Sequence, residues 1–471
     1  MTRRELVAIG LLVACVLPVA ATAQATPATP RADSAKLVPS AVPRLRYERV
    51  TLANGLEVLL HQDHSTPIVV VNTWYKVGSG DERPQRTGFA HLFEHVMFMG
   101  SENVPVGKFD QWLEAAGANN NGSTTEDRTN YYESLPSNAL PLALWLDADR
   151  MGRLLPVMDQ AKLDLQRDVV QNERRQSYDN VPYGRANETI QAALYPANHP
   201  YHWPVIGSMR DLGAAALDDV KQFFRTYYAP NNATVTIAGD FNRDSALVWV
   251  NRYFGAIPRG EIPITRPVVP AVTVARDSFL VLEDDVTLPR LYQTWHSVKA
   301  FAPDDAVLDV LSDILAGDKN ARLYKRLVFD MQVAQDVSAY QFSGRLDGYF
   351  RVQVTPKPGQ TPARMAALVR EEIERVARDG VTPRELARAL NTRRASFLDR
   401  LASVLGKSEQ LNFYNYYVGN PDYAQQDAAR YDAVTAADVQ RAARTYLMQP
   451  KVVLTVVPTG QSQLKVTGGS N

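Results

Sequence analysis

The sequence predicts an α+β fold built from two homologous domains, each a largely antiparallel sheet with helices packed on it. In each half, strand-like segments precede helix-like segments, which favours separate layers over strict strand–helix alternation. Two stretches about half the chain apart, 218–241 and 436–460, also share one pattern: Asp-Val, four residues, Arg-Thr-Tyr, a proline and a β-branched run. The shared order of helix, turn and strand indicates an internal duplication.

Composition describes an ordinary folded protein of more than one domain. The chain has 471 residues, 51 basic and 51 acidic side chains, a pI near 7.1 and 45% hydrophobic residues. This charge balance argues against nucleic acid as a partner, because phosphate-binding surfaces usually show a basic excess. After the first 23 residues no apolar stretch is long enough to span a membrane, so we expect no membrane span.

The first 23 residues are typical of a secretory signal peptide. Arg3 and Arg4 precede an apolar run that ends in Ala21-Thr22-Ala23, a small-x-small cleavage pattern. We therefore expect a periplasmic or secreted protein. Cys15, the one cysteine, lies in this run after Leu12-Val13-Ala14, which leaves lipoprotein anchoring through Cys15 as an alternative. Residues 24–44, rich in Ala, Thr, Pro and Ser, are predicted to form a flexible leader.

The remaining elements divide the chain into two domains, 45–260 and 272–471, joined by a linker at 261–271. The first domain opens with strand patterns at 49–63, turning at Asn54-Gly55, and at 68–78. The second opens with strand patterns at 279–286 and 349–356. Helical patterns follow in both, for example 139–155 and 362–378, and the linker lies in a proline-rich stretch.

An apolar helical segment, "TGFAHLFEHVMFMGS" (87–101), contains His91, Glu94 and His95. The histidines are one helical turn apart on one face and the glutamate lies beside them. Burying three such groups is costly unless they have partners. A histidine pair satisfied by hydrogen bonds is the simpler interpretation. However, H-x-x-E-H is the inverzincin pattern, in which two imidazoles hold zinc and the glutamate reaches a water.

A zinc ion held by two imidazoles needs a third protein ligand and an open position. Gln166, Val169, Val170 and Glu173 share one face of a predicted helix, which points Glu173 inward with the valines. The periodicity fits two interpretations equally: Glu173 is the third ligand, or it pairs with an arginine such as Arg167.

Five segments together resemble the M16 metallopeptidase family, whose members include pitrilysin, insulysin and mitochondrial processing peptidase, and the resemblance is to the bacterial two-domain, half-chamber type. They are "VGSGDERPQRTGFAHLFEHVMFMGS", "GANNNGSTTEDRTNYYESLP", "RDVVQNERRQSYDNVPYG", "HPYHWPVIGS" and "PNNATVTIAGDF", in the family's order across most of 45–245. The second half is similar more loosely, through "ILAGDKNARLYKRL". The resemblance implies that 45–260 is a catalytic zinc-peptidase domain and 272–471 a non-catalytic one.

The resemblance also implies roles for single residues. His91, His95 and Glu173 would hold one Zn²⁺ per chain, and Glu94 would act as general base. Gln166 stands where many relatives carry a second glutamate, and its amide would orient a ligand by hydrogen bonding. The segment Asn121, Gly122 and Ser123 would lie on an edge strand beside the zinc and bind a peptide substrate by β-augmentation; the family usually has Asn-Ala at the first two positions.

The second domain departs from the family's pattern. Aligning Gly100 with Gly317 places Leu308, Leu311 and Ser312 at the positions of the H-x-x-E-H residues, so this domain should hold no zinc. In the family, this half often supplies an Arg and a Tyr that hold the substrate carbonyl, whereas Val328 and Gln335 stand nearest to those positions here. Without such donors the oxyanion loses stabilisation.

We therefore expect a homologous M16-type subunit to supply the missing donors, in a heterodimer rather than a homodimer. Arg322 or Tyr324 as substitutes within the chain are the alternative. The expected function is that of an exported zinc-dependent endopeptidase that hydrolyses peptides or small unfolded proteins. The alternative is a non-catalytic structural or peptide-binding subunit of an M16-type complex. The complete set of His91, Glu94, His95 and Glu173 favours the peptidase, because a scaffold needs none of it.

Overall fold

The computed structural model describes residues 42–468, which all belong to one compact unit. The predicted signal peptide, Cys15 and most of the predicted leader lie outside the described residues. Ordered contacts begin ahead of Leu45. Val42 is 5% exposed and packs near Tyr414, and Arg44 forms an ion pair with Asp422 at 2.7 Å.

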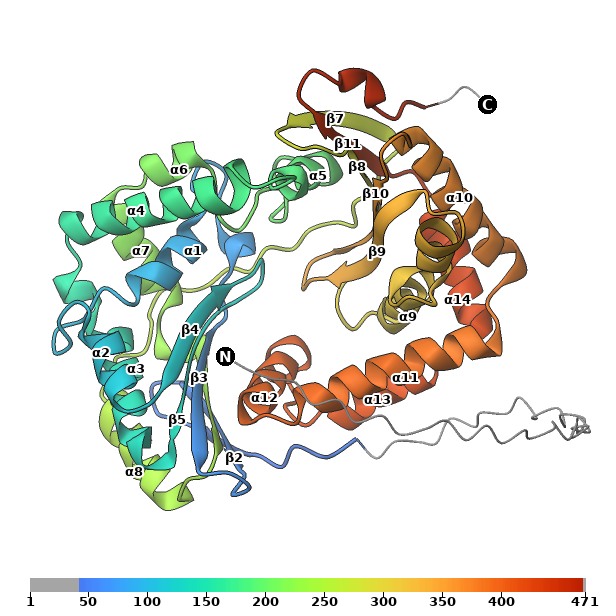
Figure 1. Cartoon of the computed structure of the whole chain (residues 1–471). Helices are drawn as coiled ribbons and strands as arrows, with labels where there is room; N and C mark the ends of the chain where they lie inside the picture. The colour runs from blue at the N-terminus through green and yellow to red at the C-terminus, as the bar shows by residue number, and fades with distance from the viewer. Residues whose placement is uncertain (1–41, 469–471) are drawn as a thin grey trace, which may run out of the picture. The chain divides into compact units, whose positions relative to one another are not determined.

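Two mixed but mainly antiparallel sheets form the framework of the described region (Figure 1). The first has the order β1-β2-β6-β3-β5-β4 and the second the order β7-β11-β8-β10-β9. The strands are β1 (Glu48–Thr51), β2 (Glu57–Gln62), β3 (Ile68–Tyr75), β4 (Asn119–Thr124), β5 (Thr129–Pro136), β6 (Ala233–Gly239), β7 (Ser278–Asp284), β8 (Arg290–His296), β9 (Ala334–Ser343), β10 (Gly348–Pro356) and β11 (Val452–Pro458).

The two sheets repeat one topology, which confirms the predicted duplication. Removing β1 from the first sheet leaves β2-β6-β3-β5-β4, which matches β7-β11-β8-β10-β9 strand for strand. The pairs β2–β6 and β7–β11 are both parallel, and the remaining pairs are antiparallel. The predicted turn at Asn54-Gly55 joins β1 to β2, with Gly55 at φ +88°, where glycine is favoured.

Helices follow the strands of each half. They are α1 (Phe89–Val96), α2 (Lys108–Ala115), α3 (Leu140–Arg153), α4 (Gln160–Arg174), α5 (Ala186–Leu194), α6 (Met209–Gly213), α7 (Leu217–Tyr227), α8 (Arg243–Phe254), α9 (Asp305–Ala316), α10 (Pro362–Asp379), α11 (Pro383–Arg400), α12 (Val404–Val418), α13 (Ala424–Asp432) and α14 (Ala436–Ala442). Short 3₁₀ turns are η1 (Ser79–Asp81), η2 (Ser137–Ala139), η3 (Leu155–Val157), η5 (Pro230–Asn232) and η8 (Ser462–Leu464); π-helical turns are η4 (Arg175–Asp179), η6 (Tyr324–Asp330) and η7 (Ala443–Leu447). None of the described helices has the length and apolar character needed to cross a bilayer.

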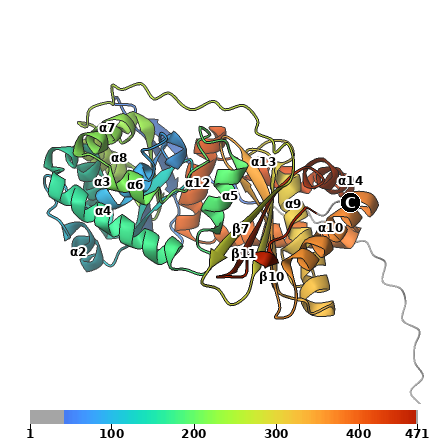
Figure 2. The same ribbon diagram turned by 90° about the horizontal axis from the view of Figure 1, so that it is seen from above.

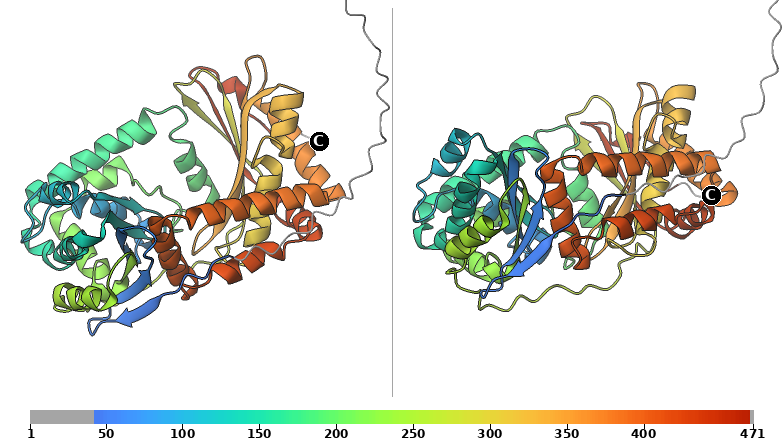
Figure 3. Two further views of the ribbon diagram at one scale, coloured as in Figure 1. Left: turned by 60° about the horizontal axis from the view of Figure 1, so that its bottom comes forward. Right: turned by 90° about the horizontal axis from the view of Figure 1, so that it is seen from below.

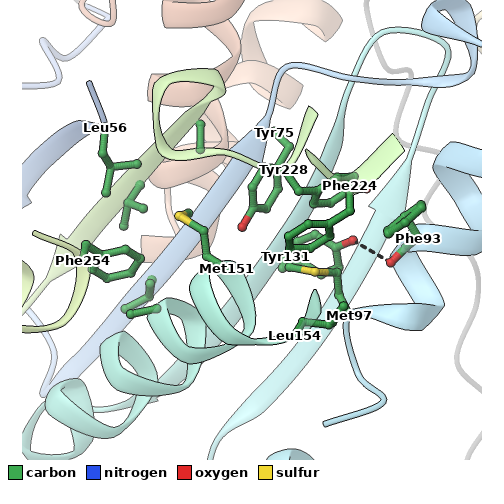
Figure 4. Packing of buried hydrophobic residues seen from close by; sticks show 14 of the residues in the cluster. Leu56, Tyr75, Phe93, Met97, Tyr131, Met151, Leu154, Phe224, Tyr228 and Phe254 are labelled. Carbon is green, nitrogen blue, oxygen red and sulfur yellow. Dashed lines mark hydrogen bonds between the residues drawn. The ribbon is translucent and has the colours of Figure 1, made fainter. Parts of the chain in front are cut away.

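The core of the first half lies between its sheet and α1, α3, α7 and α8. On β3, Val69, Val71 and Tyr75 face this core, as the alternation of a strand requires. On α1, Phe93 stacks on Phe223 of α7 with ring centroids 5.2 Å apart. Its carbonyl accepts a hydrogen bond from Tyr131 of β5, at 3.2 Å (Figure 4). These contacts fix the back of α1 and leave the opposite face to the polar residues.

One helix from each half packs on the sheet of the other half. Helix α12, from the second half, packs on β3 and β6 (Figure 3), where Asn412 accepts a hydrogen bond from Thr236 at 2.7 Å. Helix α5, from the first half, packs on β11 and β8, with Ile190 and Leu194 in a shared apolar cluster. No helix or strand is assigned between α8 and β7, and Figure 2 shows this stretch as a plain ribbon.

Candidate metal centre

The helix that carries the motif begins at a backbone feature that favours glycine. Gly88, directly before α1, has φ +86°, and a Cβ there would lie 2.8 Å from the carbonyl oxygen of Ile206. The two oxygens of Glu82 accept the backbone N–H groups of Gly88 and Ala90, at 2.9 and 2.8 Å. Burial raises the pKa of Glu82 well above its usual range. Sequence reasoning missed this cap because Glu82 lies outside the helical pattern.

The motif residues and Glu173 converge on one point. Glu173 Oε1 lies 3.7 Å from His91 Nε2, and Glu173 Oε2 lies 3.1 Å from His95 Nε2. One donor atom from each of the three residues falls within 4.8 Å of the others. Ligand atoms around a tetrahedral zinc ion are about 3.4 Å apart, given metal–ligand bonds of about 2.0–2.2 Å. The donor types and their spacing therefore fit a zinc ion.

The alternative of a hydrogen-bonded histidine pair does not account for His91. Its Nδ1 is buried with no partner among residues 42–468, and its Nε2 is too far from Glu173 for a hydrogen bond. Burial lowers the pKa of His91 to about 4, so the imidazole is neutral near pH 7 and keeps a free lone pair. The hydrogen bond with His95 lowers the pKa of Glu173, which keeps its carboxylate ionised. Neutral imidazole and ionised carboxylate are the forms that ligate metals.

Glu94 lies beside this group and is held by the first sheet. Thr124, the last residue of β4, donates its hydroxyl to Glu94 Oε2 at 2.6 Å. Gly122, two residues earlier, leaves room for the glutamate, since a Cβ there would lie 3.0 Å from Glu94 Cγ. Burial raises the pKa of Glu94, and the Thr124 hydrogen bond partly offsets that rise. A carboxylate with a raised pKa is suited to taking up and releasing a proton near neutral pH.

Glu173 is positioned from the end of α4. The neighbouring Arg174 donates to the carbonyl of Gly207 at 2.9 Å and pairs with Glu188 at 2.7 Å. Gly207 in turn lies against Gly88, because a Cβ on it would come within 2.4 Å of Gly88 Cα. The loop at Gly207 therefore ties the end of α4 to the start of α1. A π-helical turn, η4, follows directly, as is common near functional sites.

The structure revises the expectations for Val169 and Gln166 of α4 and decides against the alternative partner Arg167. Val169 does not point inward with Val170; it is 39% exposed, so the buried face of α4 is narrower than the periodicity suggested. Arg167 is not the partner of Glu173, because it pairs with Asp164 instead. Gln166 is buried as expected, but its amide donates to Met99 Sδ at 2.6 Å. Among the described residues it makes no hydrogen bond to the histidines or to Glu173.

Strand β4 is an edge of the first sheet and packs beside α1. The Thr125 N–H bonds to the Arg128 carbonyl at 2.8 Å, and this sets which β4 residues pair with β5. By alternation, the main-chain groups of Asn121 and Ser123 face β5, and those of Gly122 face the open side. The Gly122 N–H bonds to the Asn121 side chain at 2.8 Å. Of the three expected substrate-binding residues, Gly122 alone presents its main chain at the open edge.

The second domain has no equivalent site in the described region. Leu308 and Leu311 of α9 are fully buried and Ser312 is 2% exposed. Within residues 42–468, His91, His95 and Glu173 are the one group of three or more His, Cys, Asp or Glu side chains whose ligand atoms lie close enough together to hold a metal ion. Arg322 is bound to Glu385 at 2.6 Å, and Tyr324 packs against the core of the second domain. Of the two possible substitutes for the missing carbonyl donors, Arg322 is therefore engaged elsewhere.

This duplicated fold, with a His–His–Glu site in its first half, defines a zinc-peptidase-like protein. Residues 57–202 match the family described as "Insulinase (Peptidase family M16)", and residues 215–393 match "Peptidase M16 inactive domain". A Helicobacter pylori protein named "Zinc protease PqqE" is 30% identical over 389 residues, which is 81% of this chain and 86% of that protein. The chain belongs to the M16 peptidase family.

Other relatives agree with this assignment. The Bacillus subtilis protein named "Uncharacterized zinc protease YmxG" is 22% identical over 88% of this chain and 98% of its own. An Arabidopsis thaliana protein named "Probable mitochondrial-processing peptidase subunit beta" is 21% identical over 86% of this chain and 77% of its own. A solved structure of a protease from Helicobacter pylori superposes with a TM-score of 0.81 at 25% identity, covering 88% of this chain and 100% of that one.

Proposed function

We propose that this protein is a zinc-dependent endopeptidase that hydrolyses peptides or small unfolded proteins. One observation carries the proposal: His91, His95 and Glu173 converge at the spacing of zinc ligands, with Glu94 beside them. The names of the relatives as zinc proteases support it. Residues 215–393 match a domain described as inactive, but all four of these residues lie outside that span.

In this proposal, His91, His95 and Glu173 hold one zinc ion. Zinc supplies an activated water and polarises the scissile carbonyl. Thr124 holds Oε2 of Glu94, so the proton from the water passes to Oε1 and from there to the leaving amine. The substrate main chain pairs with the open edge of β4 at Gly122, which places the scissile bond beside Glu94. In this proposal the peptide bond is hydrolysed directly by water, without a covalent intermediate between enzyme and substrate.

The peptidase proposal is tested by one substitution with a matched control. Glu94→Gln should keep zinc, because Glu94 is not a ligand, and lower the hydrolysis of a quenched peptide by about 10²–10⁴-fold. Glu114→Gln, on the exposed face of α2, should leave both unchanged. Removing the metal with a chelator should abolish hydrolysis, and zinc should restore it. Undiminished hydrolysis by Glu94→Gln would contradict the mechanism. No hydrolysis by the zinc-loaded wild type would instead favour a non-catalytic role.

We also propose that a second, homologous subunit supplies the donors that hold the substrate carbonyl. The ion pair between Arg322 and Glu385 supports this proposal, as does Val328, an apolar residue that packs against the domain core. The Arabidopsis relative is named as a subunit. The purified chain alone should then hydrolyse peptides weakly, and native mass spectrometry of the chain isolated from its own cells should show a heterodimer. Full activity from a verified lone chain would refute the partner.

Finally, we propose that the protein is exported to the periplasm or secreted after cleavage at Ala23. The pattern at residues 1–23 carries this proposal. N-terminal sequencing of the mature protein should begin at Gln24. A lipid-modified N-terminus at Cys15 would instead show anchoring to a membrane.

A further inference from the structure

Equivalent hairpin turns of the two domains meet each other. In the first domain, the turn Thr125–Arg128 joins β4 to β5 and is closed by a hydrogen bond of 2.8 Å between its ends. In the second, Gly344–Asp347 joins β9 to β10 and is closed in the same way at 2.9 Å. The backbone N–H of Arg345 donates to Asp127 Oδ2 at 2.7 Å. The turn next to the metal centre is therefore bonded to its own duplicate.

Asp127 is the residue on which these contacts converge. Its side chain is 2% exposed. Tyr201 donates to its Oδ1 at 2.5 Å, and Tyr417 of α12 donates to its Oδ2 at 2.8 Å. Burial raises the pKa of both tyrosines well above the usual range, so they remain protonated donors. Burying a carboxylate is costly without such hydrogen-bond donors. The loss of one donor should therefore loosen the whole set of contacts around Asp127.

The same turn is also held from within the first domain. The N–H groups of Ser79 and Gly80 donate to the carbonyls of Thr125 and Glu126, at 3.1 and 2.8 Å. Gly78 allows this approach, because a Cβ there would lie 2.4 Å from the Thr125 carbonyl oxygen. The turn is therefore enclosed on both sides. Its position is set partly by the first domain and partly by Arg345 and α12 of the second.

The turn is directly connected to the residues that contact Glu94. Thr124 directly precedes the turn and donates its hydroxyl to Glu94 at 2.6 Å. Gly122, two residues earlier on β4, leaves the space that Glu94 occupies. A shift of the turn would therefore move both the hydroxyl that holds Glu94 and the open edge that receives the substrate.

We propose that Asp127 is a positioning residue through which the second domain holds β4 and Thr124 in register with Glu94. The described residues of the second domain include no metal site, yet in this proposal that domain sets the geometry of the site in the first. The expected kinetic consequence rests on the proposed function. The clamp, by which we mean the hold of the second domain on β4 through Asp127, is a statement about structure and does not depend on that function. Asp127 touches neither substrate nor metal in this proposal; it acts through the hairpin.

The test uses two tyrosines on one helix. Tyr417→Phe removes a donor to Asp127 and keeps the ring. Tyr414→Phe, on the same helix, removes a matching hydrogen bond to Asp427, 2.9 Å long, that is not connected to the hairpin. Amide hydrogen exchange of the full chain, read for the segment 119–132, reports the order of β4 and needs no activity. Zinc content and the KM and kcat for an extended peptide are measured on the same samples.

Tyr417→Phe should speed exchange across 119–132 by about tenfold, since local opening is set by the bonds that hold the segment. It should also raise KM by about three- to tenfold with zinc content unchanged, the result expected when substrate alignment is lost. Asp127→Asn should do the same more strongly. Tyr414→Phe should leave exchange of 119–132 and KM at wild-type values.

The inference would be overturned if amide hydrogen exchange of 119–132 in Tyr417→Phe were as slow as in the wild type. It would also be overturned if the two tyrosine variants changed this exchange rate equally. Both outcomes would count even if the protein is a peptidase. If instead the wild type hydrolyses no peptide while the exchange results appear as expected, the clamp stands and the proposed function fails. A rise in KM without faster exchange would also contradict the clamp, because the effect would not pass through β4.

Discussion

Helices α1 and α9 occupy the same place in the two duplicated domains, yet they carry different chemistry. In α1, His91 and His95 face Glu173 of α4. In α9, the aligned positions are buried leucines and a serine, and the polar pair has moved one residue along, to Asp309 and Asp313. Those two carboxylates pair with Arg393 of α11, at 3.1 and 2.5 Å.

The difference separates what the fold needs from what the site needs. Both helices bury one face in a domain core and carry polar residues at i and i+4. In α9 these residues are neutralised by an arginine within the same domain. In α1 they are imidazoles, one of which has no hydrogen bond among the described residues. The polar residues of α9 complete an ion pair, whereas those of α1 are placed where they could hold a metal ion.

The largest effect is expected when α1 is made to resemble α9. His95→Ser introduces the residue found at the aligned position, Ser312. Zinc affinity should fall by more than about a hundredfold, since even residues that only support a ligand are worth 10–100-fold. Competition with a chromophoric chelator measures this. Ser312→Ala is the control and should bind zinc as the wild type does; a loss of zinc in that variant would break the comparison.

The backs of the two helices should differ in their contribution to stability. Phe93 of α1 is 1% exposed and stacked on Phe223, and the aligned residue of α9 is the fully buried Val310. Phe93→Ala should lower the free energy of unfolding by about 3–5 kcal/mol, because it leaves a large cavity. Val310→Ala should cost about 2 kcal/mol, since fewer carbons are removed. Urea unfolding measures both, and a larger loss for Val310→Ala would contradict this account of the packing.

The starts of the two helices differ too. Glu82 caps α1 with both oxygens, whereas Asp304 before α9 makes no capping hydrogen bond with its side chain. Glu82→Gln should lower the free energy of unfolding by about 1–3 kcal/mol, because one buried acceptor becomes a donor that faces N–H groups. Glu102→Gln breaks an exposed pair with Arg153 and should cost less than about 1 kcal/mol. Equal losses in thermal or urea unfolding would show that the cap is unimportant.

A further difference concerns the pH dependence contributed by α9. Burial raises the pKa of Asp309 to about 6, above its value of 3.8 in an unfolded chain. The folded state therefore binds this proton more tightly, and the resulting stabilisation is full below pH 3.8 and lost as pH rises through about 6. Urea unfolding between pH 4 and 7 should show that Asp309→Asn removes this fall in stability. An unchanged slope in the variant would mean that Asp309 does not titrate in this range.

Much of the fold followed from local patterns. The shared Asp-Val-x₄-Arg-Thr-Tyr segments predicted a duplication, and the two sheets repeat one strand order. The spacing of His91, Glu94 and His95 placed them on one helix face. The distance to Glu173 was needed to choose between a ligand and a salt bridge, because periodicity gives a face and not a partner.

The remaining features depend on contacts between distant parts of the chain. No local sequence pattern indicates that α5 and α12 each pack on the sheet of the other domain. An apolar helix face does not reveal which sheet covers it. Glu82 and Asp127 lie in loops, where a buried carboxylate looks like any exposed one until its donors are placed. Val169 was misjudged for a related reason: a helix at the edge of a domain buries a narrower stripe than its apolar residues suggest.

The central claim is that the metal site is confined to the first domain. Diffraction data collected on both sides of the zinc absorption edge, from crystals of the protein grown with zinc, test it most directly. The account predicts one anomalous peak per chain, about 2.0–2.2 Å from His91 Nε2, His95 Nε2 and a Glu173 oxygen. A peak at Asp309 and Asp313, or no peak beside His91 and His95 in zinc-loaded protein, would contradict it.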